Sequence, residues 1–188
     1  MSDVLTILSI LSTILIPLFI WLWRKYYLRP ELTIELEPYR QQSCPEGFSS
    51  NNIAVDGVIE MRAALQIFRL SWTFFLKIRN NSEHNAYYPN LYLRENGILF
   101  TAVEDINPQD AIGSGENISL KLCYEEQEEC VGEKRTSIGR FPSSAFDNLE
   151  ILISYRNFAK HNFYSLYKHN SKTTSFLIRK PKGFLKYN

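Results

Sequence analysis

Three residues near the carboxyl end of the sequence have types and a spacing that could do chemistry. They are Arg156, Asn157 and His161, in the pattern R-N-x3-H. A histidine can act as a general acid or base, and an arginine can stabilise developing negative charge. The spacing alone is weak evidence, because an R-x4-H is expected by chance roughly 0.2 times in a chain of this composition. The pattern lies between two strand-like runs, LEILISY and FYSLY, which favours a polar hairpin turn with Arg156 paired to an acid over a catalytic site.

The rest of the sequence offers no other catalytic or cofactor signature. It contains no GxxxxGK, GxGxxG, GxSxG or HExxH pattern. The three cysteines, Cys44, Cys123 and Cys130, have no CxxC spacing. An odd number of unclustered cysteines argues against a zinc site or a disulfide framework and suits a reducing cytoplasm. We therefore expect no cofactor and no bound metal.

The elements that must position this pattern begin with an apolar segment at the amino terminus. Residues 4–23 carry no charge over 20 consecutive positions. As a helix they would be roughly 30 Å long, the thickness of the hydrocarbon core of a bilayer. We expect residues 1–29 to form a single transmembrane anchor with its juxtamembrane segment. The end of the segment carries rings and cations typical of a membrane interface, at Trp21, Trp23, Arg24, Lys25, Tyr26 and Tyr27.

The charges that flank this segment predict its orientation. Residues 1–3 contain no lysine or arginine, whereas Arg24, Lys25 and Arg29 follow the segment. By the positive-inside rule the amino terminus should lie outside and residues 30–188 in the cytoplasm. No basic leading region or small-residue cleavage site is present, so we expect a retained single-pass anchor and not a cleaved signal peptide.

Small hydroxyl residues form a stripe along the expected helix. Thr6, Ser9 and Thr13 recur at i, i+3 and i+7, with Ser12 beside them. Such a stripe suits a helix that packs against copies of itself or faces a water-filled lumen. It equally suits hydroxyls that bond back to their own i−4 carbonyls. Both interpretations stay open at this point.

Residues 30–188 predict a mainly β, antiparallel β-sandwich-like domain. In residues 68–79 apolar and polar residues alternate six times, which indicates a long strand with one buried face. We expect residues 40–52 to be a loop, the acidic run EEQEEC to begin a solvated excursion, and Asn96-Gly97 to turn a hairpin. The expected strands are residues 32–36, 68–79, 87–94, 98–103, 118–125, 149–155, 163–168 and 174–179.

The pattern at Arg156, Asn157 and His161 resembles the signature of HEPN ribonucleases. In that family the histidine works as general acid or base on the 2′-hydroxyl and leaving oxygen, while the arginine stabilises the phosphorane. With its amino-terminal anchor and length of 188 residues, the chain also resembles small accessory membrane proteins encoded beside the RNA-guided RNA nuclease of type VI-B CRISPR systems. That resemblance implies a homo-oligomeric pore in the bacterial inner membrane that enhances antiviral defence by compromising the membrane.

Three functions follow as hypotheses. The leading one is a non-enzymatic membrane pore, in which Arg156, Asn157 and His161 form an interface or lumen-facing polar cluster. Its partners would be the lipid bilayer, further copies of the chain and, functionally, an RNA-guided RNA nuclease. The second is a membrane-tethered ribonuclease that uses Arg156 and His161 and binds RNA through the basic segment 151–188. The third is a membrane-anchored protein-interaction domain.

Overall fold

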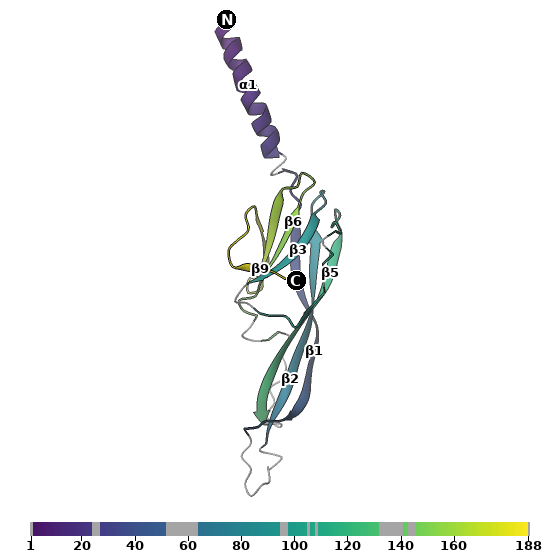
Figure 1. Cartoon of the computed structure of the whole chain (residues 1–188). Helices are drawn as coiled ribbons and strands as arrows, with labels where there is room; N and C mark the ends of the chain where they lie inside the picture. Colours follow the sequence, from purple (N-terminus) through teal and green to yellow (C-terminus); the bar gives the residue numbers. More distant parts are fainter. Residues whose placement is uncertain are drawn as a thin grey trace.

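The structure, a computed structural model, combines one helix with nine β-strands (Figure 1). It describes residues 2–23, 27–51, 64–94, 98–104, 106–107, 109–131, 141–142 and 146–187, with the side chains of α1 described from residue 11 onward. The elements are α1 (Ser2–Leu22), β1 (Leu32–Phe48), β2 (Leu65–Asn80), β3 (Tyr87–Arg94), β4 (Ala102–Val103), β5 (Asn117–Val131), β6 (Glu150–Arg156), β7 (Asn162–Lys168), β8 (Thr173–Leu177) and β9 (Phe184–Lys186).

The strands form two antiparallel sheets, which confirms the mainly β prediction. The four-stranded sheet has the order β1-β2-β5-β4, and the five-stranded sheet has the order β8-β7-β6-β3-β9. The two sheets meet along one edge, where the Thr174 hydroxyl of β8 accepts a hydrogen bond from the Ile34 N–H and donates one to the Ile34 carbonyl, both at 3.1 Å. This contact covers part of the open edge of β1, which would otherwise offer unpaired backbone groups to another chain.

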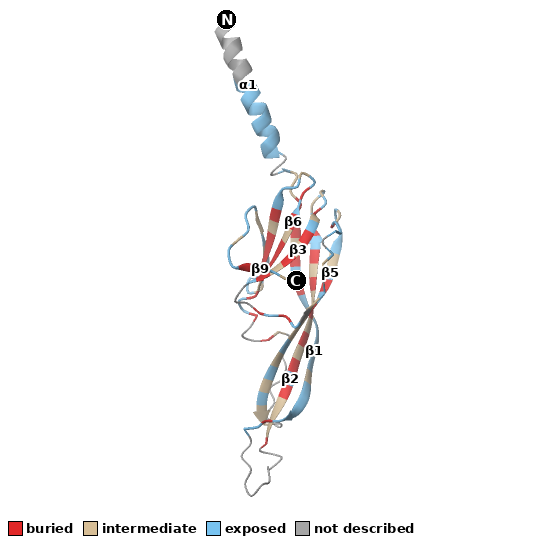
Figure 2. Cartoon of the chain, viewed as in Figure 1, coloured by how far each residue is buried: buried red, intermediate tan, exposed pale blue. Residues whose placement is uncertain are grey.

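One hydrophobic core joins the two sheets (Figure 2). The long alternating strand predicted at residues 68–79 lies within β2, and its buried face is the one that the sequence indicated. Residues of β5 and β6 pack against the same cluster, among them Leu122 and Ile153, which are fully buried. The predicted face is at most 9% exposed at each position: Phe68, Leu70, Trp72, Phe74, Leu76 and Ile78.

The first strand is longer than the sequence predicted. We expected a strand that stops at Pro38 and a loop over residues 40–52, but β1 continues to Phe48. Two prolines, Pro38 and Pro45, lie at shifts in its register with β2. A proline has no N–H to donate to a sheet ladder, but an edge strand with bulges tolerates it at positions where no donor is required.

The start of the expected acidic excursion was also placed wrongly, and its continuation over residues 132–140 lies outside the described residues. Residues 125–131 belong to β5 and pair with the amino-terminal half of β2, from Val131 opposite Leu65 to Glu125 opposite Ser71. The backbone of this run is hydrogen-bonded to β2, and that pairing keeps it in a strand although a run of glutamates by itself does not predict one. The long strands β1, β2 and β5 thereby extend as a ribbon beyond the second sheet (Figure 1).

The predicted hairpin after β3 is contradicted. The strand expected at residues 98–103 is reduced to β4, which pairs with β5 in the other sheet. Strand β3 instead pairs with β6 and β9. Because residues 95–97 lie outside the described residues, the turn itself has no structural account. The chain crosses from one sheet to the other here, which a local Asn-Gly signal does not reveal.

Helix α1 extends away from both sheets (Figure 1). Its side chains from Leu11 onward are all exposed, and large apolar residues such as Ile14 and Phe19 have more than 60% of their surface uncovered (Figure 2). Within the part of the chain that the structure describes, no helix is both long enough and apolar enough to cross a membrane.

A half-buried histidine at the end of β7 gives the domain a pH-dependent stability. Burial lowers the pKa of His169, nearby Lys172 lowers it further, and Asp147 opposes them. The unfolded chain therefore binds this proton at a higher pH than the folded chain does, so folding stability falls as the pH falls below about 6.5. We expect His169→Phe to remove part of the loss in Tm between about pH 7.5 and pH 5.5.

The control for this measurement is His161→Gln, because the His161 side chain is exposed. That variant should keep the wild-type dependence of Tm on pH. Equal pH profiles for wild type and His169→Phe would contradict the assignment. The ring of His169 packs 4.6 Å from that of Phe141, centroid to centroid, so an aromatic replacement keeps the contact.

Candidate functional site

The R-N-x3-H pattern forms the turn between β6 and β7. Arg156 ends β6 and pairs with Asn162, the first residue of β7. Asn157 closes the turn, because its N–H donates to the His161 carbonyl at 3.1 Å and its carbonyl accepts from the Lys160 N–H at 2.9 Å. The Asn157 side-chain oxygen accepts the His161 N–H at 3.0 Å. The predicted hairpin turn is therefore correct, and the motif lies on strands and a loop.

The side chains of Arg156 and His161, the two candidate catalytic groups, lie in different surroundings. The Arg156 Nε–H donates to Asn162 Oδ1 at 2.9 Å, and the guanidinium lies 5.8 Å from the centre of the Tyr88 ring. No carboxylate pairs with Arg156 among the described residues, so the expected acid partner is wrong. His161 enters the turn through its backbone, and its side chain is exposed. The side chain that Arg156 contacts instead is Tyr88 of β3. Strand β3 pairs with β6 but is far from it in the sequence.

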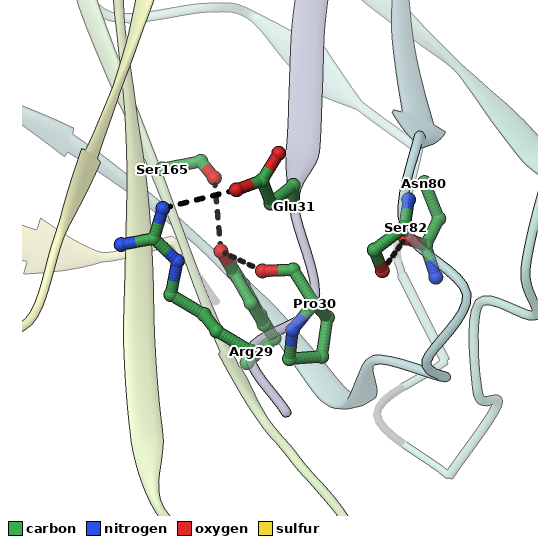
Figure 3. Close-up of polar contacts among 7 residues, drawn as sticks. Arg29, Pro30, Glu31, Asn80, Ser82 and Ser165 are labelled. Atoms are coloured by element: carbon green, nitrogen blue, oxygen red, sulfur yellow. Dashed lines mark hydrogen bonds and ion pairs between the residues drawn. The ribbon is translucent and has the colours of Figure 1, made fainter. Parts of the chain in front are cut away.

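A buried tyrosine ties the segment after α1 to the second sheet (Figure 3). The Tyr155 hydroxyl donates to the Pro30 carbonyl at 2.9 Å and lies 3.3 Å from the Ser165 hydroxyl. Burial raises the pKa of Tyr155, so the phenol remains protonated and able to donate. Beside it, the Arg29 guanidinium pairs with Glu31 at 3.2 Å. The chain is thus fixed to β6 immediately before it enters β1.

The turn residue Asn157 makes a second link to the same segment. Asn157 as a residue is 2% exposed, and its side-chain amide donates to the Leu28 carbonyl at 3.4 Å. Arg29 also lies over the ring of Phe176 in β8, 5.2 Å from its centre. Residues 28–31 therefore contact two strands of the five-stranded sheet, β6 and β8, and the turn between β6 and β7. We call the contacts that Tyr155, Asn157 and Phe176 make with residues 28–31 the junction, and we include in it Ser165, which lies against the Tyr155 hydroxyl.

A buried asparagine organises the loops next to the junction. Asn80 is fully buried at the end of β2. Its side-chain oxygen accepts from the Ser82 hydroxyl at 2.7 Å (Figure 3) and from the Ser82 N–H at 3.1 Å. The next residue, Asn81, donates its N–H to the Glu31 carbonyl at 2.9 Å. The side-chain amide of Asn80 donates to two backbone carbonyls, those of His84 at 2.8 Å and Ile112 at 3.0 Å.

Aromatic rings run along one side of α1 toward the junction. The centres of the Phe19 and Trp23 rings are 6.0 Å apart, and Trp23 stacks on Tyr27 at 4.0 Å. Trp21, Trp23 and Tyr27 are all exposed. Phe19, Trp23 and Tyr27 follow one another at intervals of four residues, the spacing at which side chains of a helix meet. Three further residues expected at the interface, Arg24, Lys25 and Tyr26, lie outside the described residues.

The expected hydroxyl stripe is described in part. Ser12 and Thr13 belong to α1 and are exposed. The side chains of Thr6 and Ser9 lie outside the described ones, although both residues are helical. The stripe of Thr6, Ser9 and Thr13 and its role in helix packing therefore stay predictions.

The sequence did not indicate the residues that build the junction. Tyr155 and Ser165 stand on opposite sides of the β6–β7 turn, and their strand pairing was readable from the two apolar runs. Pro30 lies 125 residues from Tyr155, so no local pattern could connect them. The only usable signal was Tyr155 itself, a phenol at a position whose alternation predicts burial, because a buried hydroxyl requires a hydrogen-bond partner.

Among the described residues, no group of three or more His, Cys, Asp or Glu side chains is placed to hold a metal ion. The arrangement around residues 156–162 can hold a turn and present a cation. It does not bring the side chains of Arg156 and His161 into a hydrogen bond with each other within the described chain.

No protein-family model, no curated protein sequence and no solved structure matches this chain.

Asn157→Ala is expected to lower the free energy of unfolding by about 1–2 kcal/mol, because it removes two hydrogen bonds made by a buried side chain. His161→Ala should change it by less than about 0.5 kcal/mol, since the turn uses only the backbone of His161. Denaturant unfolding of the intact protein in detergent measures both. A larger loss for His161→Ala than for Asn157→Ala would contradict the assigned roles.

Proposed function

We propose that this chain is a membrane-anchored, non-enzymatic homo-oligomer whose helices gather into a pore in a bacterial inner membrane. In this proposal residues 4–23 span the bilayer with the amino terminus outside. Residues 30–188 form the cytoplasmic body. The pore would enhance RNA-guided antiviral defence by compromising the membrane. Because one helix cannot enclose a lumen, the function requires several copies of the chain.

The exposed apolar surface of α1 is the observation that carries the proposal. From Leu11 to Trp23 the helix offers ten large hydrophobic side chains, each between 38% and 65% exposed. Leaving such side chains in water costs about 1.5 kcal/mol or more for each one fully exposed. A soluble monomer would carry that cost in full, whereas lipid or neighbouring helices would remove it. The ladder of Phe19, Trp23 and Tyr27 suits the headgroup layer at the end of a span.

The loops beside the junction also suit a membrane surface. Phe158 projects from the β6–β7 turn with 59% of its surface exposed, and the exposed cation Lys160 follows it. Tyr88, at the start of β3, is 52% exposed. An aromatic ring flanked by cations is favourable at an anionic lipid interface. These residues lie at the end of the domain from which α1 extends, so an anchored helix would bring them toward the headgroups.

Leakage of a trapped dye from liposomes tests the proposed function directly. Purified full-length protein, reconstituted into vesicles of phosphatidylethanolamine and phosphatidylglycerol, should release the dye as protein density rises. Its mass in detergent should correspond to several copies. A strictly monomeric protein that leaves vesicles sealed would refute the proposal. Retention of the dye by an oligomer would favour the anchored interaction domain instead.

A membrane-tethered ribonuclease is the second candidate, because Arg156 carries a charge that no described carboxylate neutralises and His161 is exposed on the same loop. Incubation of the intact protein with labelled single-stranded RNA tests it. Cleavage that disappears in His161→Ala would favour the ribonuclease. Uncleaved RNA together with dye leakage would favour the pore, since the two assays have separate readouts.

A further inference from the structure

A cavity of about 320 Å³ opens on the side of the five-stranded sheet that faces away from the core. Its lining residues come from β3, β6 and β7, and two of them, Tyr92 and Tyr164, pack against a small apolar cluster of Leu152, Leu166 and Phe184. Its lining residues include Tyr88, Tyr92, Tyr164, Asn90, Asn162 and Arg156. Its size and its mixture of planar rings with a few polar groups are typical of sites for small ligands.

A bulge in β3 places one wall of this cavity. The register between β3 and β6 shifts between Tyr87 and Asn90. Within the shift Tyr88 has a φ of 54°, a left-handed conformation that a bulky residue rarely adopts. The Asn90 amide holds the bulge by donating to the Tyr88 carbonyl at 2.9 Å. The strained backbone brings the Tyr88 ring under the guanidinium of Arg156, 5.8 Å from the ring centre.

The cavity is electropositive. Asn162 accepts the Arg156 Nε–H, and within the described chain no aspartate or glutamate lines the cavity. A second cation lies next to it, because the Lys180 ammonium is 4.1 Å from the centre of the Tyr92 ring. The Arg156 guanidinium is held through Nε and lies over the Tyr88 ring, so its remaining N–H groups can be offered to an oxyanion.

We propose that this cavity binds a phosphate ester, with the phosphate on Arg156 and the esterified group against the tyrosine rings. Inorganic phosphate would use only the arginine, whereas an ester gains contact with the aromatic walls. The same chemistry is found in a soluble nucleotide and in a phospholipid headgroup. The site is built wholly from the β domain, so it goes beyond the proposed pore and does not depend on it.

Titration calorimetry on the full-length protein in dodecyl maltoside tests the site with three probes: inorganic phosphate, adenosine 5′-monophosphate and dihexanoyl phosphatidylglycerol. We expect at least one of the two esters to bind more tightly than inorganic phosphate. Arg156→Gln should weaken that ester by about tenfold or more, the effect expected for loss of a charge-assisted contact. Tyr88→Ala should weaken the ester and leave the affinity for inorganic phosphate within about twofold.

The matched control is Arg69→Gln, which removes the same charge from the far half of β2, where Arg69 pairs with Glu46. It should leave the affinity unchanged within about twofold. Binding of the nucleotide alone would identify a soluble ligand, and binding of the lipid alone a headgroup. The proposal is overturned if neither ester binds wild type at about 10 mM, an affinity weaker than any specific site of this size would show. It is equally overturned if both arginine variants lose affinity to the same extent. Thermal unfolding of each variant shows that it remains folded, and Lys180→Gln supplies a second change in charge outside the turn.

Discussion

Lysine at both Leu11 and Leu15 is expected to release the chain from the membrane and abolish dye leakage. The two leucines lie one helical turn apart in the middle of residues 4–23, and about half of each side chain is exposed. Replacing a leucine by lysine at the centre of a spanning helix costs about 3–4 kcal/mol on insertion scales. Two such changes would reduce insertion by a factor of about 10⁴ to 10⁶. Fractionation of membranes after a carbonate wash, followed by liposome leakage, measures the two effects.

Valine at the same two positions is the control, because it shortens the side chains and keeps them apolar. That variant should stay in the membrane fraction. If the double lysine variant also stays there and still releases dye, α1 is not the element that enters the bilayer. The β domain should remain folded in every case, since the described side chains of α1 lie outside its core.

Phe74→Ala is expected to lower the free energy of unfolding by about 3–5 kcal/mol, the usual cost of truncating a large core side chain. Phe74 is completely buried on β2. Its ring centre lies 4.8 Å from that of Phe146 and 5.5 Å from that of Phe141. No neighbour can fill the space of a lost ring without moving the segment that holds Phe146. Denaturant unfolding monitored by far-ultraviolet circular dichroism measures the loss.

The adjacent residue provides a control of the same chemical type. Phe75 points to the opposite face of β2 and is half-buried, with its ring 4.7 Å from that of Tyr39. Phe75→Ala removes the same atoms from the same strand and should cost about 1 kcal/mol, because only one cross-strand aromatic pair is lost. Equal losses for the two variants would mean that the faces of β2 were assigned incorrectly.

The faces of the central strand could be predicted because strand periodicity is local. Every second residue from Phe68 to Ile78 is apolar, and a strand places those residues on one side whatever its neighbours are. The β6–β7 turn was equally local, since Asn157 and Lys160 stand between two apolar runs. The interpretation of R-N-x3-H as a polar turn therefore succeeded from sequence alone.

The features that the sequence could not predict depend on pairing between strands that are distant in the sequence. Pro38 looks like a strand terminator unless β1 is known to be an edge strand. The glutamates of β5 look solvated unless their pairing with β2 is known. Arg156 was expected to find an acid, but β3 brings Tyr88 beside it. In each case a partner outside the local segment outweighs the intrinsic preference of the residues.

The length of β1 determines how far the ribbon of long strands reaches from the junction. The strand starts two residues after Pro30 and continues for 17 residues to Phe48. At about 3.3 Å per residue that is roughly 55 Å. With Pro30 held at the headgroups, the far tip of the ribbon would stand some five nanometres above the lipid, comparable to the width of a cytosolic protein. A partner bound at that tip would remain clear of the bilayer, and a force applied there would reach the junction along β1, whose pairing with β2 shifts register at Pro38 and at Pro45.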